Sequence, residues 1–224
     1  YLVTARHNLF DAAAASSRIG LVLRPWQAEG ERDDVPIPAA SSWDFPEDDA
    51  VDLAVLPHWQ FDMPHGVAAI PIHDFAGDSV LRDNNVGPGE EVFMIGLFTG
   101  GGFTRAERPI VRMGSIAAMN DSPMVDNGGR TYQVFLIEAR SHGGLSGSPV
   151  WTARSRPRGD NVITEARLLG VVRGHWETAS VQASGVATPE LNMGIAQVTP
   201  IQPLVELLMS RAAFAARRKA RGAR

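Results

Sequence analysis

The sequence contains no cysteine, and this absence narrows the chemistry that is open to the protein. It excludes disulfide bonds, thiolate metal sites and a cysteine nucleophile. No apolar stretch reaches the roughly eighteen residues of a membrane-spanning helix, so we expect no membrane span. Positive charge is not in excess, because the formal net charge is -4, and we expect no nucleic-acid partner. Composition alone sets neither the compartment nor the oligomeric state.

The length and the hydrophobic content suit a folded chain with a sizeable core. The 224 residues are 44% hydrophobic, which is enough for one large domain or two small ones. The first residue is Tyr1 rather than methionine, and we interpret the chain as a fragment or a processed product.

Short β-like runs, separated by clusters of Gly, Pro, Asn and Asp, make up most of the chain. The residues from Val92 to Phe98 have no polar side chain, which is typical of a strand buried on both faces. The spacing of these runs predicts an all-β fold of barrels or a sandwich. The predicted strands are Tyr1–Ala5, Ile19–Arg24, Val51–Leu56, Val67–Ile72, Glu91–Phe98, Pro109–Ile116, Tyr132–Ala139, Ser148–Thr152, Arg167–Arg173 and Met193–Val198.

The C-terminal end has a helical pattern instead. Thr199 is a suitable cap and Pro200 fits a first turn, and apolar residues then recur at helical spacing up to Met209. We expect a helix packed on the β body. The residues after Ser210 form a basic tail that we expect in solvent, with contact to nucleic acid or anionic lipid as the less favoured alternative.

Two polar segments suggest how the chain is divided. The stretch 74–88 is mostly polar and ends in a Gly-Pro turn, and Thr99–Arg108 contains three successive glycines and is interpreted as a surface hairpin loop. We therefore predict an N-terminal unit at 1–85, a second unit at 86–199, and a helix with its tail at 200–224.

A histidine and an aspartate lie beside two of the predicted strands. His7 closely follows the run that ends in Thr4-Ala5, and an imidazole that titrates near neutral pH suits a general base. Asp52 lies near the start of an apolar run, where burial of a lone carboxylate costs on the order of several kcal/mol unless a partner such as a histidine N–H satisfies it. The alternatives are a histidine that simply ends a strand and an aspartate that caps a turn.

A serine is surrounded by glycines in the segment Gly143–Pro149. Glycine permits left-handed backbone conformations and a close approach of ligand, so such a turn can expose the Ser146 hydroxyl and aim nearby amides at one point. The alternative is a flexible Gly/Ser loop, which the strand-like runs on both sides make less favourable.

Together, the three segments resemble the trypsin/chymotrypsin-like serine peptidase family, in its short, cysteine-free bacterial branch. The matching motifs are T-A-x-H at Thr4–His7, D-x-A-V at Asp52–Val55 and G-x-S-G-x-P at Gly144–Pro149, in the order His, Asp, Ser. Leu169–Val172 resembles the strand that walls the family's substrate pocket, and Gly194–Thr199 resembles its closing strand.

The resemblance implies two antiparallel six-stranded β-barrels with the site between them, followed by a C-terminal α-helix. The first barrel would be truncated at its N-terminal end, because the family's preceding strand is missing. The implied activity is that of a serine endopeptidase that cleaves polypeptides without a cofactor. Its catalytic residues would be His7, Asp52 and Ser146, and the amides of Gly144 and Ser146 would form the oxyanion hole.

Some positions depart from the family. Leu145 stands where many members have an aspartate that pairs with a newly cut N-terminus, so we predict no activation by that route. Arg173 replaces a small hydroxyl residue near the aspartate, which favours the alternative of a weak or inactive fold that binds peptides or proteins. We expect no metal site, because His58, His65 and His73 lack ligand-like spacing.

The substrate pocket is expected near the nucleophile and along the walling strand. A positively charged pocket would favour substrates with an acidic or polar side chain at the cleaved residue. The alternative is that Arg140 points to solvent and does not contribute to the pocket. The predicted pocket residues are Arg140, Ser141, Arg173, Gly174, His175 and Gly194.

Overall fold

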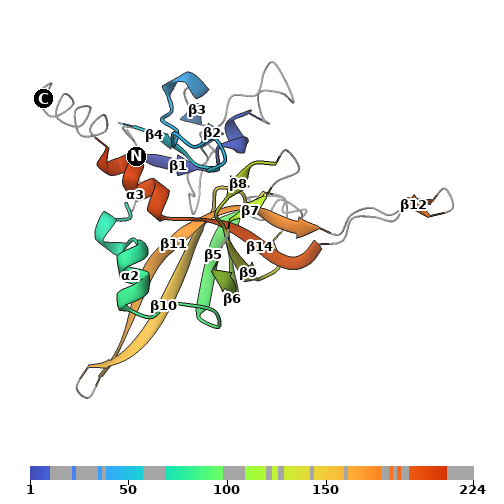
Figure 1. The fold of residues 1–224 in the computed structure, drawn as a ribbon. Helices are drawn as coiled ribbons and strands as arrows, with labels where there is room; N and C mark the ends of the chain where they lie inside the picture. The colour runs from blue at the N-terminus through green and yellow to red at the C-terminus, as the bar shows by residue number, and fades with distance from the viewer. Residues whose placement is uncertain are drawn as a thin grey trace, which may run out of the picture.

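In its computed structural model the described part of the protein is mostly β, with short α-helices at Asp78–Asp83 and Gln202–Met209 and a helical run that starts at His7 (Figure 1). The structure describes residues 1–10, 22–23, 35–36, 39–57, 69–97, 109–119, 123–125, 129–141, 144–158, 161–177, 182–183, 186–187 and 192–210. The predicted loop Thr99–Arg108, the tail after Ser210, Gly143, His58 and His65 lie outside these residues.

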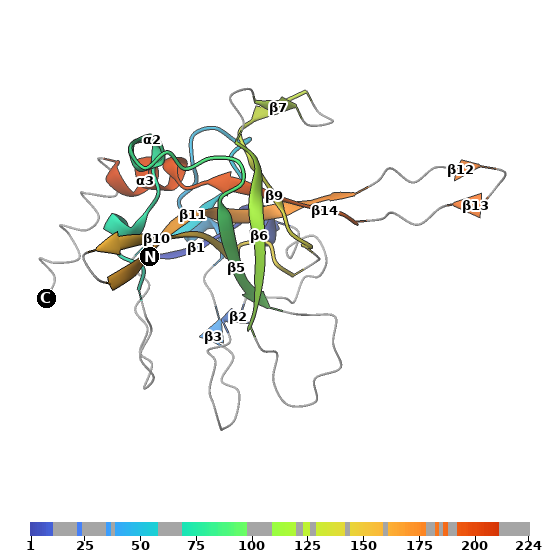
Figure 2. The same cartoon turned by 90° about the horizontal axis from the view of Figure 1, so that it is seen from below.

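Six strands close into an antiparallel barrel in the order β10-β11-β14-β9-β6-β5. Figure 2 shows β5, β6 and β9 side by side on one side of it. The predicted all-β class and one six-stranded barrel are thereby confirmed. The barrel strands are β5 (Glu91–Leu97), β6 (Pro109–Met119), β9 (Phe135–Glu138), β10 (Pro149–Arg158), β11 (Asn161–Glu177) and β14 (Asn192–Pro200).

In the described part of 1–85, β1 (Leu2–Thr4) pairs antiparallel with β4 (Ala54–Leu56), and no second closed barrel is formed there. Other strands make two-stranded ladders. These are β2 (Val22–Leu23) with β3 (Val35–Pro36), β7 (Met124–Val125) with β8 (Thr131–Tyr132), and β12 (Gln182–Ala183) with β13 (Val186–Ala187).

The helices pack on one side of the barrel. α2 (Asp78–Asp83) lies beside α3 (Gln202–Met209) in Figures 1 and 2, and the Asp78 N–H donates to the Gln202 side chain at 3.3 Å. Two single 3-10 turns are η1 (Ala40–Ser42) and η2 (Ile72–Asp74). The predicted C-terminal helix is confirmed.

Three details differ from the predictions. Thr199 and Pro200 end β14, and the helix begins after Ile201 with Pro203 in its first turn, so the predicted cap was wrong. The strand predicted at Val67–Ile72 is wrong in its described part, because Pro71 has no N–H to donate to a ladder. Burial of β5 on both faces was also wrong, since Val92 and Met94 point into the barrel while Ile95 remains 40% exposed.

Two of the three apolar clusters among the described residues involve the barrel. One fills the barrel and includes Met94, Ile137 and Leu145. The other joins β4 to the barrel and to α3 through Val55, Leu204 and neighbouring residues. Full burial of each such aliphatic side chain stabilises the fold by about 1.5–3 kcal/mol. The second cluster therefore fixes β4, and the segment before it, against the barrel.

Candidate active site

His7 and Asp52 form a close pair at one end of the β1–β4 ladder. The register of the ladder places Thr4 opposite Ala54, so the residues just after β1 lie beside those just before β4. His7 Nδ1 is 2.7 Å from Asp52 Oδ2, and the His7 main-chain N–H donates to Asp52 Oδ1 at 2.9 Å. A carboxylate can only accept, so Nδ1 carries the ring proton and Nε2 is free of it when the ring is neutral.

Asp52 is only 8% exposed. Burial by itself would raise the pKa of its carboxyl group. The hydrogen bonds from the His7 ring and main chain, together with the positive charges of His7 and Arg173, outweigh that effect and hold the pKa below its ordinary value of 3.8. Asp52 is therefore ionised at neutral pH and orients the imidazole.

The Ser146 turn depends on glycine at two positions. Gly144 and Gly147 have φ values of 95° and 89°, in the left-handed region that other residues rarely adopt. A Cβ atom at Gly147 would lie 2.5 Å from the Thr4 hydroxyl, so glycine also permits the turn to pack on the segment before His7. The turn is closed by the bond from Ser148 N–H to the Leu145 carbonyl at 2.9 Å.

Asn8 joins this turn to the segment that carries His7. Its Nδ2 group donates to the Ser146 carbonyl at 2.9 Å and to the Thr4 hydroxyl at 3.1 Å. Sequence reasoning missed Asn8, although its spacing of four from Thr4 and its place next to His7 were available signals. The fold thus brings all three sequence-predicted segments together.

The Ser146 hydroxyl donates its hydrogen to the Arg173 main-chain carbonyl at 3.2 Å. The amides of Gly144 and Ser146 make no hydrogen bond to another residue in the described parts of the chain. They are therefore open to an oxygen atom brought to this turn. Leu145, between them, is fully buried in the barrel core and has no role at the surface.

The Arg173 side chain turns away from the nucleophile. Its Nη1 group donates to the Ala50 carbonyl at 2.8 Å, and its guanidinium carbon lies 4.0 Å from the centre of the Tyr132 ring. Sequence analysis placed Arg173 in the pocket and did not identify Ala50 or Tyr132 as partners. Neither partner could be found by local spacing, because both lie far from Arg173 in the sequence.

The other predicted pocket residues lie along adjoining strands, since β9, β14 and β11 are neighbours. Ser141 is only 2% exposed, and its hydroxyl has no partner among the described residues. The Ser141 carbonyl accepts from Asn192, whereas Arg140 is exposed. Gly194 has a φ of 78°, and its carbonyl accepts from the Ala139 N–H at 2.9 Å.

Two residues follow Arg173 on the same strand. Gly174 is opposite Gln197 of β14, and His175 is opposite Ala196. His175 Nε2 lies 2.6 Å from Glu177 Oε1, so this imidazole is engaged by a carboxylate of its own strand. Beyond Arg173, β11 therefore continues with a histidine and a glutamate whose side chains contact each other.

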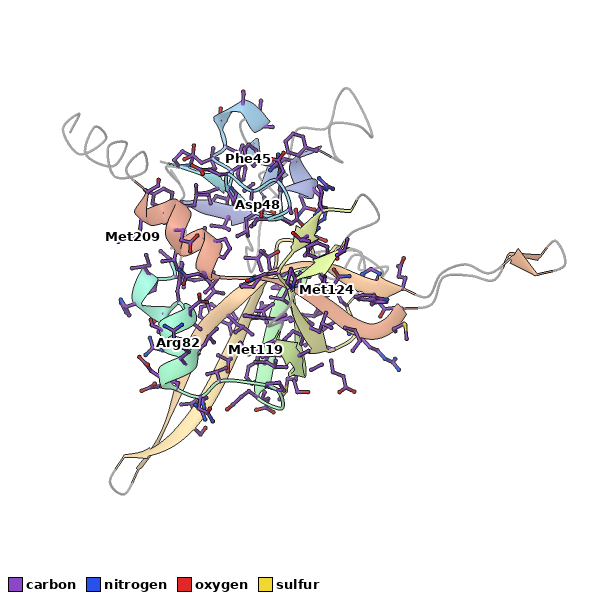
Figure 3. All side chains as sticks on the ribbon, in the orientation of Figure 1. Phe45, Asp48, Arg82, Met119, Met124 and Met209 are labelled. Atoms are coloured by element: carbon purple, nitrogen blue, oxygen red, sulfur yellow. The ribbon has the colours of Figure 1, made fainter. Side chains whose placement is uncertain are left out.

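A separate groove of about 1150 Å³ lies between residues 45–51, α2, α3 and the connection from β6 to β9. His7 and Ser146 are not among the described residues that line it, so it is distinct from the candidate site. Figure 3 labels side chains that line this groove, namely Phe45, Asp48, Arg82 and Met119.

No three His, Asp or Glu side chains among the placed residues gather as metal ligands would. His73 Nε2 lies 3.6 Å from Asp74 Oδ1. In the described portion, no helix has the length and apolar character needed to cross a membrane. No protein-family model matches the chain, and no curated protein matches its sequence.

Proposed function

We propose that the protein is a serine endopeptidase of the trypsin-like family, with His7, Asp52 and Ser146 as its catalytic residues. The observation that carries the proposal is the two-bond pairing of Asp52 with the His7 ring and main chain, 2.7 and 2.9 Å long. The packing of the Ser146 turn on the segment that carries His7 adds support.

In the proposed reaction Ser146 Oγ attacks a peptide carbonyl carbon, and His7 Nε2 takes the serine proton. The C–N bond of the resulting tetrahedral intermediate breaks, and His7 passes the proton to the leaving amine. Water then attacks the acyl-enzyme by the same route. Asp52 holds the ring and stabilises its cationic form, and the amides of Gly144 and Ser146 receive the oxyanion.

The reaction requires one rotation of the serine side chain. Its hydrogen is directed at the Arg173 carbonyl, 3.2 Å away, and must be redirected to His7. Rotation of χ1 between staggered positions changes the direction of the hydroxyl without movement of the turn. Such catalytic hydrogen bonds commonly tighten only when substrate is bound.

We further propose that residues 1–85 belong to the first barrel of a two-barrel fold, with 86–199 as the second barrel and 200–224 as the closing helix and tail. The β1–β4 ladder and its apolar contact with the closed barrel support this division. The cleft between the two units would then receive the polypeptide substrate.

The second candidate function is a peptide- or protein-binding module with little or no catalysis. The hydrogen bond from Ser146 to Arg173 favours it, because that bond uses the only proton of the hydroxyl group. An Arg in place of a small hydroxyl residue at position 173 points in the same direction.

A fluorophosphonate probe, which reacts covalently with an activated serine, separates the two functions. We expect labelling of the parent protein, complete loss in Ser146→Ala, and parent-like labelling in the control Ser155→Ala, an exposed serine on β10. A folded parent that resists the probe identifies the binding module. If the parent is labelled, fresh parent protein without the probe is then tested on a peptide library, where internal cleavage identifies an endopeptidase.

A further inference from the structure

We propose that Arg173 is a positioning residue of the candidate site, with two effects. Its guanidinium group fixes the turn before Asp52 against the barrel, and its positive charge stabilises the Asp52 carboxylate. The inference rests on the proposed function. It concerns a residue that the sequence suggested as a pocket residue and as a reason for weak activity.

The position of Arg173 in its strand explains the direction of its side chain. Val172 pairs with Val198 and Gly174 pairs with Gln197, so Arg173 is the extra residue of a β-bulge. A bulge changes the direction in which side chains leave a strand, and bulges recur beside active sites for this reason. Here the bulge directs the long side chain out of the barrel wall.

The contact with Ala50 acts directly on the turn that carries the carboxylate. This turn has its own bonds, from the Ala50 N–H to Asp48 Oδ1 at 2.9 Å and from the Val51 N–H to the Asp48 carbonyl at 3.1 Å. The Ala50 carbonyl accepts from Arg173, two residues before Asp52. The guanidinium therefore anchors the turn from the barrel side.

Tyr132 holds the guanidinium in this position. A distance of 4.0 Å from the guanidinium carbon to the ring centre is a close cation–π contact. Tyr132 belongs to β8, in the connection from β6 to β9, so the contact ties three parts of the chain together. The aromatic face restricts the rotamers of a side chain that is otherwise long and flexible.

The main chain of the same residue reaches the nucleophile. The Arg173 carbonyl accepts the Ser146 hydroxyl at 3.2 Å, while its side chain engages the turn before Asp52. One residue thus contacts the segments of both the carboxylate and the serine. A displacement of the bulge would therefore move the Ser146 turn and the turn before Asp52 relative to each other.

The charge of Arg173 has a separate consequence. The guanidinium charge, together with the hydrogen bonds and the charge of His7, outweighs burial and holds the pKa of the Asp52 carboxyl group below its ordinary value. Among the neighbouring charged groups, Arg6 pairs with Asp49 at 2.9 Å and Asp48 accepts the Ala50 N–H. Removal of the Arg173 charge should therefore raise the titration midpoint of Asp52.

Two substitutions separate charge from geometry. Arg173→Gln removes the charge but keeps a hydrogen-bond donor, and Arg173→Lys keeps the charge but loses the planar group that stacks on Tyr132. A matched control is Arg154→Gln, because Arg154 also bonds a main-chain carbonyl, that of Asn84, and pairs with Glu90 at 3.1 Å. Arg154 lies on the β10–β11 hairpin, opposite Glu165.

The first readout is the plateau rate of fluorophosphonate labelling, and the second is the NMR titration of the Asp52 carboxyl carbon. For Arg173→Gln we expect the Asp52 midpoint to rise by about 0.5 unit and the plateau rate of labelling to fall about tenfold. For Arg173→Lys we expect a fall in plateau rate with the Asp52 midpoint of the parent. Arg154→Gln should match the parent in both readouts.

An unchanged Asp52 midpoint in Arg173→Gln, or an equal shift in Arg154→Gln, would overturn the proposal while Ser146-dependent labelling left the proposed function intact. If the parent is not labelled, the proposed function fails, and the NMR titration still tests the charge effect by itself. Should Arg173→Gln not fold, Tyr132→Leu replaces it as the geometric test. The expected result is a fall in plateau rate, and a parent-like plateau would contradict the proposal.

Discussion

Replacement of Asp52 by Asn removes the negative charge that faces the His7 ring, while the side chain keeps almost the same shape. The Asn carbonyl oxygen can still accept the His7 main-chain N–H, now made to Asp52 Oδ1 at 2.9 Å. The amide nitrogen then faces His7 Nδ1, where the carboxylate now stands 2.7 Å away. Two donors cannot bond each other, so the ring proton moves to Nε2, the atom that accepts the proton of Ser146 in the proposed reaction.

The expected loss of stability follows from the deleted ion. A hydrogen bond to a charged group contributes about 1.5–3 kcal/mol, so Asp52→Asn should lower the free energy of unfolding by that amount at pH 7. The pKa of Asp52 lies below 3.8 in the folded protein, so its stabilising contribution is complete above the unfolded value. It is lost as the pH falls through the folded pKa, and the difference between parent and variant should shrink there.

The expected loss of activity is larger. With the proton on the wrong ring nitrogen, the rate of the proposed reaction should fall on the order of 10⁴-fold, which is the loss that this substitution causes in the chymotrypsin-like triad. That factor corresponds to about 5.5 kcal/mol of transition-state stabilisation. Binding of peptide should change little, because the shape of the site is retained.

Denaturation by urea, followed by tryptophan fluorescence, measures the stability difference. Trp43 is buried in a cluster with Ala54 and Leu56 of β4, so its emission reports on this half of the chain. The titration is run on parent and variant from pH 7 down to about pH 2, below the ordinary carboxyl range. A stability difference of the same size across the whole range would refute the assigned ionisation, and unchanged labelling in Asp52→Asn would refute the catalytic role.

Two further substitutions test how the site is held. Gly147→Ala should lower the free energy of unfolding by about 2–4 kcal/mol, because a left-handed φ of 89° is combined with a Cβ contact of 2.5 Å to Thr4. In the control Gly129→Ala, with a φ of 79° and open space around the added Cβ, the loss should be about 1 kcal/mol. Equal losses for the two variants in urea denaturation would show that the Cβ contact with Thr4 does not contribute. Leu204→Ala should cost about 2–5 kcal/mol through the cavity it leaves under α3. Met209→Ala on the same helix, at 65% exposure, should stay within about 0.5 kcal/mol, and a Leu204→Ala melt no different from it would contradict the packing argument.

The sequence alone predicted the parts of the site whose chemistry is unusual for their surroundings. A carboxylate next to an apolar strand has few stable arrangements, so Asp52 indicated a buried donor partner, and His7 fills that place. Glycines on both sides of Ser146 indicated a turn that other residues could not form, and two of them have positive φ. These inferences depend on large free-energy penalties, for an unpaired buried carboxylate and for a left-handed backbone at a residue other than glycine. Such penalties are evident from the residue types alone.

The features that sequence reasoning missed depend on small differences between competing arrangements. Pro71 removes one ladder donor and thereby excludes a strand that the apolar residues around it would favour. The direction of Arg173 is set by a single register shift against β14, and a shift of this kind leaves no composition signal. Long-range pairs such as Arg173 with Tyr132 are decided by the closed barrel as a whole.

The contacts around Asp52 also show what an arginine at position 173 contributes. In the proposed trypsin-like site, a small hydroxyl residue there would contribute a hydrogen bond but no charge, and the carboxylate would depend more on the His7 ring for compensation. A guanidinium held by Tyr132 and Ala50 supplies charge without contacting the carboxylate, so both oxygens remain with His7. A fixed nearby charge can therefore preserve the orientation of His7 that the proposed function requires.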